Sequence, residues 1–335
     1  MSKSGSAAPS SSSLPGSDAS VSAAKRAALL LTNKRSGGAE RDLASAIECL
    51  EQGGFDVAVE TPESVDVLRR RIGECGEATV VLGGGDGTLN AAAPALRRLA
   101  RPFGLLPLGT ANDLARTLEI PLDPVEAAAV IVAGSTRRID LGLIDGAPFF
   151  NVASLGLSAE VVREHESEGA RKRLLGVLNY PLSAWAAFRR HRPFKAELII
   201  DGEPLRCRCM QIAVGNGRHY GGGMTIDERA EIDDGWLKVY YLRPAGLMAM
   251  LWMLPALRFG WLRRTSEAEV RWARRVEIRT RRPRPLDVDG ELNGRTPVVI
   301  EIAPGAVEVF APPGRTREGR GLPVEGDPAK GDEEP

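Results

Sequence analysis

Runs of apolar residues alternate with segments of helical spacing through the first third of the chain. Residues 27–31 form a short apolar run, and residues 55–60 alternate apolar and polar side chains as strands do. Residues 39–52 repeat apolar side chains at helical spacing and end at a Gly-Gly pair. Helices are also expected at 63–72, 89–96 and 124–133, and strands at 80–82 and 103–108. This alternation predicts a doubly wound parallel α/β domain.

From about residue 140 the pattern changes to successive strands. Most of these runs are rich in β-branched residues, and several alternate apolar and polar positions. Strands are expected at 139–144, 149–153, 196–200, 206–214, 237–242, 275–280, 286–288 and 296–302. The second half of the chain therefore predicts a mostly antiparallel β-sandwich.

The two ends of the chain differ from both domains. Residues 1–24 are rich in Ser, Gly and Ala and lack the apolar segment of a signal peptide. Residues 313–335 are rich in Pro, Gly and charge. We therefore expect disordered tails at 1–24 and 313–335, an α/β domain at 25–140 and a sandwich domain at 141–302.

Charge and cysteine content restrict the class of function. The chain of 335 residues carries 44 basic and 44 acidic side chains, which argues against a general nucleic-acid binder. The cysteines are scattered, and neither His nor a second Cys pair completes a zinc site beside Cys207 and Cys209. We expect reduced thiols and a cytoplasmic protein.

A glycine-rich stretch follows the strand at 80–82. Gly83-Gly84-Gly85-Asp86-Gly87-Thr88 leads into the helix at 89–96. Glycines let a ligand approach the backbone, and N–H groups at a helix start bind anions. Thr88 would cap the helix or contact phosphate. Asp86 would repel phosphate unless it holds Mg²⁺ or accepts a proton. On its own, the stretch is equally compatible with a tight turn and a solvated Asp.

A second polar turn strengthens the phosphate interpretation. Gly109-Thr110-Ala111-Asn112-Asp113-Leu114-Ala115-Arg116 follows the apolar run at 103–108 and enters a helix. Turns that follow neighbouring parallel strands face one crevice at the carboxyl end of the sheet. The two turns together indicate a shared anion site.

The pair of motifs resembles the catalytic domain of diacylglycerol and sphingoid-base lipid kinases, in the form closest to the soluble bacterial lipid kinases. The first motif also occurs in NAD kinases, whereas the second restricts the resemblance to lipid kinases. The matching segments lie, with gaps between them, from about residue 27 to about residue 312. It implies ATP and Mg²⁺, an active site between the domains, and a return of residues 303–312 to the first domain. The nucleotide-binding residues that it implies are Asn33, Lys34, Gly84, Gly85, Gly87, Thr88, Gly109, Thr110, Asn112, Asp113 and Arg116.

Three later motifs extend the resemblance. Lys172 lies in a Lys-x-x-x-Gly-x-x-x-Tyr pattern and would point at the nucleotide phosphates, although a solvated basic helix start is the plain alternative. The Asp233–Leu237 motif, Asp-Asp-Gly-x-Leu, supplies carboxylate and backbone oxygens to a structural Mg²⁺ in bacterial relatives, which implies Asp233, Asp234 and Leu237 here. A tight hairpin turn is the alternative.

The last motif is Asp287-Val288-Asp289-Gly290-Glu291. The resemblance places the final Glu close to the acceptor hydroxyl, whose proton must be taken as it attacks phosphorus. Glu291 is therefore the first choice of base, and Asp86 is the second. Taken alone, the motif is an ordinary hairpin turn.

Residues 245–257 carry no charge and are followed by several arginines. The run is too short to span a bilayer, so it is an interfacial contact or a core helix. We expect a peripheral protein that binds reversibly to the inner membrane face and meets its lipid substrate there. We also expect a homodimer.

The motifs and the resemblance together predict an ATP-dependent lipid kinase, and the resemblance implies diacylglycerol as the acceptor, which would give phosphatidic acid. A sphingoid base, ceramide or NAD are alternative acceptors. A non-catalytic lipid- or nucleotide-binding module is the rival from another class.

Overall fold

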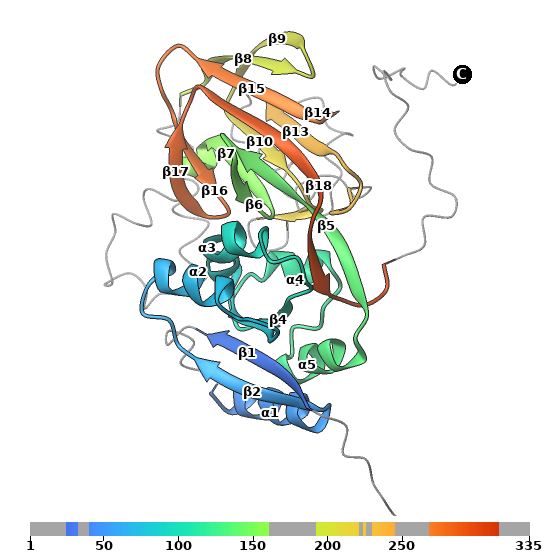
Figure 1. Ribbon diagram of the computed structural model, residues 1–335. Coiled ribbons are helices and arrows are strands. Elements are labelled where there is room, and N and C mark those ends of the chain that lie inside the picture. The colour runs from blue at the N-terminus through green and yellow to red at the C-terminus, as the bar shows by residue number, and fades with distance from the viewer. Residues whose placement is uncertain are drawn as a thin grey trace, which may run out of the picture.

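The computed structural model describes residues 25–32, 40–160, 192–220, 224–225, 230–244 and 268–314. Figure 1 shows two domains joined by long strands. Asn33, Lys34, Lys172, the apolar run at 245–257 and both tails lie outside the described residues, apart from residues 313–314 at the start of the second tail.

The N-terminal domain is built on a parallel sheet in the order β2-β1-β3-β4. Buried aliphatic side chains dominate its central strands, as expected where helices cover both faces. The strands are β1 (Arg26–Thr32), β2 (Phe55–Glu60), β3 (Thr79–Gly84) and β4 (Gly104–Pro107).

Helices cover both faces of this sheet. The chain moves from β1 to β2 in one direction and from β2 to β3 in the other, so right-handed crossovers place the two connecting helices on opposite faces. Accordingly, the first helix packs against α5, and α2 packs against α3. The helices are α1 (Glu40–Gln52), α2 (Val65–Gly73), α3 (Asp86–Leu96), α4 (Asp113–Thr117) and α5 (Pro124–Ala133).

The described residues of the C-terminal domain form two antiparallel six-stranded sheets and a small two-stranded sheet. The sheet orders are β6-β5-β18-β15-β8-β9 and β14-β13-β10-β7-β16-β17. One apolar core contains side chains from both sheets, among them Leu198 and Ile278 from one and Leu155 and Val239 from the other. Two sheets that share a core in this way form a sandwich, which confirms the predicted fold class.

The strands of this domain have the following bounds. They are β5 (Thr136–Ile144), β6 (Ala147–Phe149), β7 (Val152–Gly156), β8 (Phe194–Ile200), β9 (Glu203–Cys209), β10 (Gln211–Gly215), β11 (His219–Tyr220), β12 (Met224–Thr225), β13 (Leu237–Leu242), β14 (Ala268–Ala273), β15 (Arg275–Thr280), β16 (Pro285–Val288), β17 (Glu291–Arg295) and β18 (Val298–Phe310).

Strands β5 and β18 pair along their length and run from one domain into the other, as Figure 1 shows. The far end of β18 reaches the first domain, where Phe103 N donates to Glu308 O at 3.0 Å and Phe310 N donates to Phe103 O at 2.9 Å. Val309 is fully buried in the core of the N-terminal domain. The boundary expected at residue 140 therefore falls inside β5, a strand that the two domains share.

Two expected strands are each divided in the structure. The run at 149–153 breaks between β6 and β7, which belong to different sheets. The run at 206–214 breaks at Met210, where the chain leaves β9 for β10 in the opposite sheet. The apolar residues Phe150 and Met210 follow directly after β6 and β9, so the hydrophobic pattern does not show that these strands have ended.

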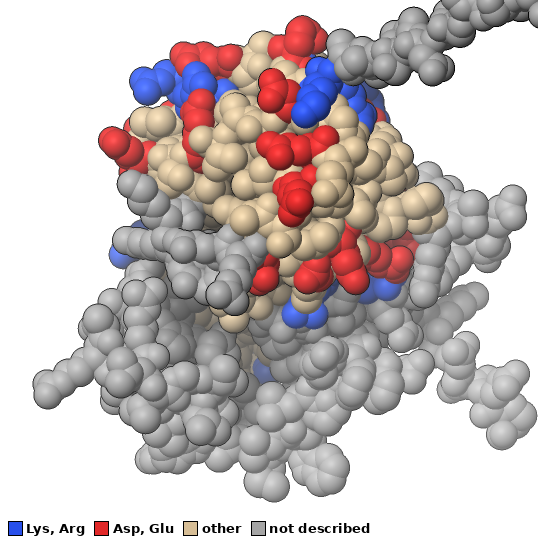
Figure 2. Space-filling view, turned by 90° about the horizontal axis from the view of Figure 1, so that it is seen from below, with Lys and Arg blue, Asp and Glu red and all other residues tan. Residues whose placement is uncertain are grey.

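Figure 2 views the molecule from below Figure 1 and shows the charged side chains of that face. Asp and Glu lie scattered among neutral residues, with Lys and Arg in small groups near the edges. The described part of this face carries no continuous basic patch.

Candidate active site

The first glycine turn joins β3 to α3. Gly84 ends the strand, Gly85 is the N-cap residue, and the helix begins at Asp86. A Cβ on Gly84 would lie 2.6 Å from Thr88 Oγ1, so the Thr88 side chain lies over the strand end. Gly85, and not Thr88, therefore caps the helix. The first N–H groups of a helix lack intrahelical acceptors, which suits the turn to bind phosphate.

The second turn is held by the side chain of Asn112. Its Oδ1 atom accepts a hydrogen bond from Gly109 N at 3.0 Å, and its Nδ2 atom donates to Gly109 O at 2.8 Å. Asn112 has a φ of 51°, a left-handed conformation that Asn tolerates better than most residues. The buried amide thus shapes the loop that leads into α4.

The two turns are packed against each other through their backbones. A Cβ on Gly85 would lie 2.9 Å from Gly109 Cα, a distance that real Cβ atoms do not adopt. Leu108 N donates to Gly84 O at 3.0 Å just beside this contact. The structure therefore brings together the two motifs that the sequence placed on neighbouring strands.

Asp86 links the turns through its carboxylate. Oδ2 accepts from Asp113 N at 3.1 Å, and Oδ1 accepts from Leu114 N at 3.3 Å. A carboxylate at a helix start is stabilised by those N–H groups and by the helix dipole. Asp86 thus holds the start of α4, in addition to any role with Mg²⁺ or a proton.

Glu291 comes from the other domain. It is the first residue of β17 and is exposed, and its Oε1 atom lies 3.5 Å from the position of a Cβ on Gly87. The hairpin of β16 and β17 therefore carries a carboxylate to the first glycine turn. Whether this carboxylate lies beside an acceptor hydroxyl stays a prediction.

Asp289 fixes the tip of that hairpin. Its carboxylate accepts from the N–H groups of Phe150 at 3.0 Å, Asn151 at 3.1 Å and Val152 at 2.7 Å, and Asp289 N donates to Val152 O at 2.9 Å. Burial raises the pKa of Asp289 to about 7, while the three N–H groups oppose the rise and the charge of Asp86 adds to it. Asp289 belongs to the last sequence motif, but its spacing there does not indicate this bracing role.

Polar side chains from the neighbouring strands β7 and β10 of the same sheet support the hairpin. Ser154 Oγ donates to Asp287 at 3.2 Å and lies 2.6 Å from Ser158 Oγ. Gln211 Nε2 donates to Ser158 Oγ at 2.8 Å. Asp287 also accepts from Gly290 N at 2.9 Å, and burial raises the pKa of this carboxyl. These contacts tie the Asn151–Ala159 segment to the hairpin that carries Glu291.

The remaining predicted nucleotide residues lie around the second turn. Thr110 is exposed, and Asp113 is buried at the start of α4. Arg116 Nε donates to Ala111 O at 2.9 Å and so braces the turn from the helix. Whether these residues contact a nucleotide stays a prediction.

The two aspartates predicted to hold a structural metal are each paired with a different basic side chain. Asp233 Oδ2 lies 3.0 Å from Arg137 Nη2, and Asp234 Oδ2 lies 2.5 Å from Lys238 Nζ. Leu237 is buried in the sandwich core. Lys238 was not predicted as a site residue, although a lysine within the apolar run of β13 is an unusual signal.

Two features are absent from the described residues. Within the described ranges, no cluster of three or more His, Cys, Asp or Glu side chains is arranged to hold a metal ion. No helix in the same ranges is both long and apolar enough to span a bilayer.

Comparisons with known proteins agree with the two-domain architecture. Residues 27–144 match the diacylglycerol kinase catalytic domain, and residues 151–311 match the YegS C-terminal NAD kinase beta sandwich-like domain. The protein named "Probable lipid kinase YegS-like" of Pseudomonas aeruginosa (strain UCBPP-PA14) is 32% identical over 293 residues, 85% of this chain and 94% of the relative. Its namesake in Chromohalobacter salexigens is 32% identical over 285 residues, 82% of this chain and 89% of the relative.

A solved structure shows the same fold. The crystal structure of a diacylglycerol kinase from Bacillus anthracis str. Sterne superposes with a TM-score of 0.69 at 20% identity, over 86% of this chain and 97% of that chain. Both domains and nearly the whole length of the curated relatives are covered, and the chain therefore belongs to the family of YegS-like lipid kinases with a diacylglycerol kinase catalytic domain.

Proposed function

We propose that this protein is an ATP-dependent lipid kinase that phosphorylates the hydroxyl of diacylglycerol to give phosphatidic acid. The observation that carries the proposal is the position of Glu291 beside Gly87. A carboxylate from one domain there faces a glycine turn of phosphate-binding type in the other domain. Family membership supports the same reaction class.

The glycine turns would receive the phosphates of Mg·ATP. Gly85 and Gly109 expose backbone at the ends of adjacent strands, and α3 starts directly behind the first turn. Backbone N–H groups and a helix start favour anions without any basic side chain. Lys34 and Lys172 lie outside the described residues, and the resemblance makes both candidates to offset phosphate charge.

Glu291 would act as the general base. The acceptor oxygen attacks the γ-phosphorus, the bond from that phosphorus to the bridging oxygen of ADP breaks, and the hydroxyl proton passes to the Glu291 carboxylate. The products are a lipid phosphomonoester and ADP. Exposure of Glu291 leaves the carboxylate open to an acceptor that arrives from outside.

Diacylglycerol is proposed as acceptor because the catalytic-domain family and the solved structure carry its name. Such a substrate resides in a membrane, so we also propose reversible binding at the inner membrane face.

The test is transfer of labelled γ-phosphate from Mg·ATP to mixed vesicles containing diacylglycerol, ceramide or a sphingoid base, and to NAD. Wild type is compared with Glu291→Gln, which keeps the size of the side chain but cannot take a proton. Glu203→Gln is the matched control, because Glu203 is an exposed glutamate at the start of β9.

We expect labelled phosphatidic acid with wild type and Glu203→Gln, and a loss on the order of 10²–10⁴-fold with Glu291→Gln. Label in another lipid would retain the reaction class and replace diacylglycerol as the acceptor. Label in NAD alone, or full activity of Glu291→Gln, would contradict the proposal.

A further inference from the structure

A lysine lies within β13, a fully buried strand of the C-terminal domain. Every residue of β13 is buried, and Lys238 is 0% exposed. An ammonium ion removed from water is strongly destabilising unless charged and polar groups surround it. The partners of Lys238 therefore decide why the residue is tolerated there.

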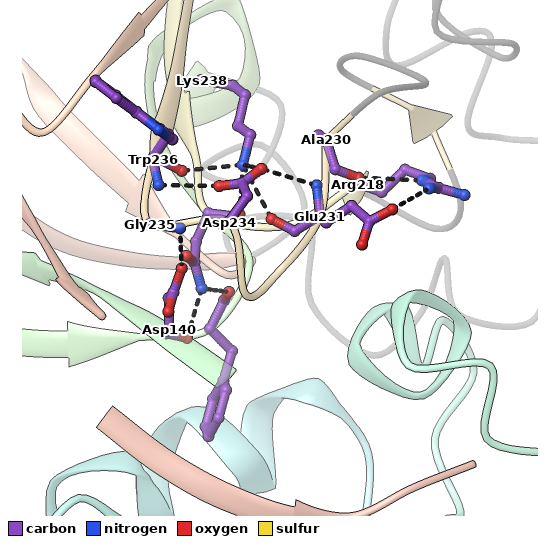
Figure 3. Close-up of polar contacts among 10 residues, drawn as sticks. Asp140, Arg218, Ala230, Glu231, Asp234, Gly235, Trp236 and Lys238 are labelled. Atoms are coloured by element: carbon purple, nitrogen blue, oxygen red, sulfur yellow. Dashed lines mark hydrogen bonds and ion pairs between the residues drawn. The ribbon is translucent and has the colours of Figure 1, made fainter. Parts of the chain in front are cut away.

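Oxygen atoms surround this ammonium group (Figure 3). Lys238 Nζ lies 2.5 Å from Asp234 Oδ2 and donates to the carbonyl oxygens of Trp236 at 2.9 Å and Glu231 at 3.0 Å. The carbonyl oxygen of Asn216 lies at 3.3 Å. One carboxylate and three carbonyls thus converge on a single positive charge.

The same oxygen types form the structural Mg²⁺ site that the resemblance implies for this loop. Carboxylate and carbonyl oxygens are the ligands of hard cations, but Mg²⁺ requires them at about 2.0–2.1 Å in octahedral geometry. Here the Nζ atom lies within hydrogen-bonding distance of the three nearest oxygens, so the ammonium group already occupies the space between them. A metal ion and the ammonium group exclude each other.

The two aspartates of the motif are also engaged elsewhere. Asp234 Oδ1 accepts from Trp236 N at 2.9 Å, and Asp234 Oδ2 accepts from Glu231 N at 3.0 Å. The carboxylate of Asp233 pairs with Arg137, whose Nη2 atom lies 3.0 Å from Asp233 Oδ2. The residues present do not fit the implied metal, so no step of the reaction is assigned to it.

We infer that the ammonium group of Lys238 is the resident cation of this loop and replaces a structural divalent ion. A covalently attached cation cannot dissociate, so the conformation of residues 231–236 does not depend on the concentration of free Mg²⁺. The only divalent ion that the proposed reaction requires is then the one that accompanies ATP.

The loop lies where several strands of both domains meet. Asp140 accepts from Gly235 N at 2.6 Å and from Gly305 N at 2.8 Å, on β18. Asn216 Nδ2 donates to the carbonyl oxygens of Asp140 at 2.8 Å and Phe150 at 2.9 Å. The cation therefore stabilises the junction of β5, β10, β13 and β18, which makes its identity measurable through global stability.

The first measurement uses wild-type protein without nucleotide. Thermal unfolding is recorded in EDTA, in millimolar Mg²⁺ and in millimolar Ca²⁺, and bound metal is measured by mass spectrometry after dialysis. We expect the three Tm values to agree to within about 2 °C, which is less than the shift caused by a change of 1 kcal/mol in the free energy of unfolding of most domains of this size. We also expect no stoichiometric bound metal. A lower Tm in EDTA that Mg²⁺ restores, or one bound divalent ion per chain, would overturn the inference.

Two variants distinguish the effect of the positive charge of Lys238 from the effect of the volume of its side chain. Lys238→Met fills the space without a cation, so we expect Tm to fall by roughly 5–10 °C in all three solutions. Lys238→Ala leaves the oxygens around an open space, so we expect a similar fall in EDTA and partial recovery with Mg²⁺ or Ca²⁺. Lys195→Ala, at an exposed position of β8, is the control and should not change Tm.

The outcomes are decisive without any assay of activity. A Lys238→Met protein with wild-type Tm, or a Lys238→Ala protein that no divalent ion stabilises, would contradict the inference. If neither variant folds, the wild-type comparison in EDTA and Mg²⁺ decides alone. The readouts are Tm and metal content, so the inference stands or fails independently of the proposed lipid kinase reaction.

Discussion

Gly109 and Gly85 lie so close that a Cβ on Gly109 would be 2.5 Å from Gly85 Cα and 2.7 Å from Asn112 Oδ1. Neither neighbour can move easily, because one is backbone and the other is bound twice to the same turn. The contact explains why both motifs have glycine at these positions. It also makes the geometry of one turn depend on that of the other.

Gly109→Ala should therefore separate the turns. We expect a loss of about 1–3 kcal/mol in the free energy of unfolding, together with a higher KM for ATP. Gly73→Ala is the control, because Gly73 is an exposed residue of α2 with open space around it. Chemical denaturation and steady-state kinetics measure the two effects. Equal stability of both variants would show that the turns can move apart freely.

Substitution of Asp86 should distinguish its contact with α4 from a chemical role. Asp86→Ala removes the acceptors for Asp113 N and Leu114 N, so we expect the free energy of unfolding to fall by about 0.5–2 kcal/mol. Asp86→Asn retains one acceptor oxygen, and we expect near wild-type stability but a loss on the order of 10²-fold in kcat/KM. An Asn variant with wild-type kcat/KM would show that Asp86 only joins the turns.

Asp289 should make stability depend on pH. Its pKa is about 7 in the folded protein against an ordinary value of 3.8, and burial is the main cause. Between about pH 4 and pH 7 the folded state then binds more protons than the unfolded state, so this contribution to stability falls as pH rises. It is fully present below about pH 4 and absent above about pH 7.

The measurement is Tm from pH 4 to pH 8 for wild type and Asp289→Asn, which does not titrate. The difference, wild type minus variant, should decrease as pH rises, because other titrating groups cancel in the comparison. A difference that increases with pH would mean that the three N–H groups outweigh burial and favour the ionised carboxylate. A constant difference would show that the pKa of Asp289 is the same in both states.

Much of the fold could be predicted because local signals agreed with the final structure. The helix expected at 124–133 matches α5, where Asp123 caps the start and Gly134 takes a left-handed φ of 77° at the end. Strands with a clear pattern, such as β13 and β15, also have the expected bounds. In these segments each element carries its own start and stop signals.

The features that could not be predicted depend on contacts between distant residues. The break between β6 and β7 is stabilised by Asp289, which lies 139 positions after Phe150. Lys238 is surrounded mainly by carbonyl oxygens, and carbonyls are present at every residue and leave no mark in the sequence. Conversely, the proximity of Glu291 to Gly87 was implied by the family motif and not by spacing or periodicity.

The return of β18 to the N-terminal domain should make the two domains unfold together. Val309 is 0% exposed among residues of the first domain, so Val309→Ser should cost about 2–4 kcal/mol by opening a cavity and burying a hydroxyl. We expect faster hydrogen exchange at the amides of Phe103 and Phe310, which bond across this junction. Val299→Ser changes a half-buried residue on the same strand, beyond the junction, and should leave exchange at Phe103 unchanged. Protection of Phe103 that survives in Val309→Ser would mean that the first domain keeps its sheet edge without β18, and that the two domains are independent folding units.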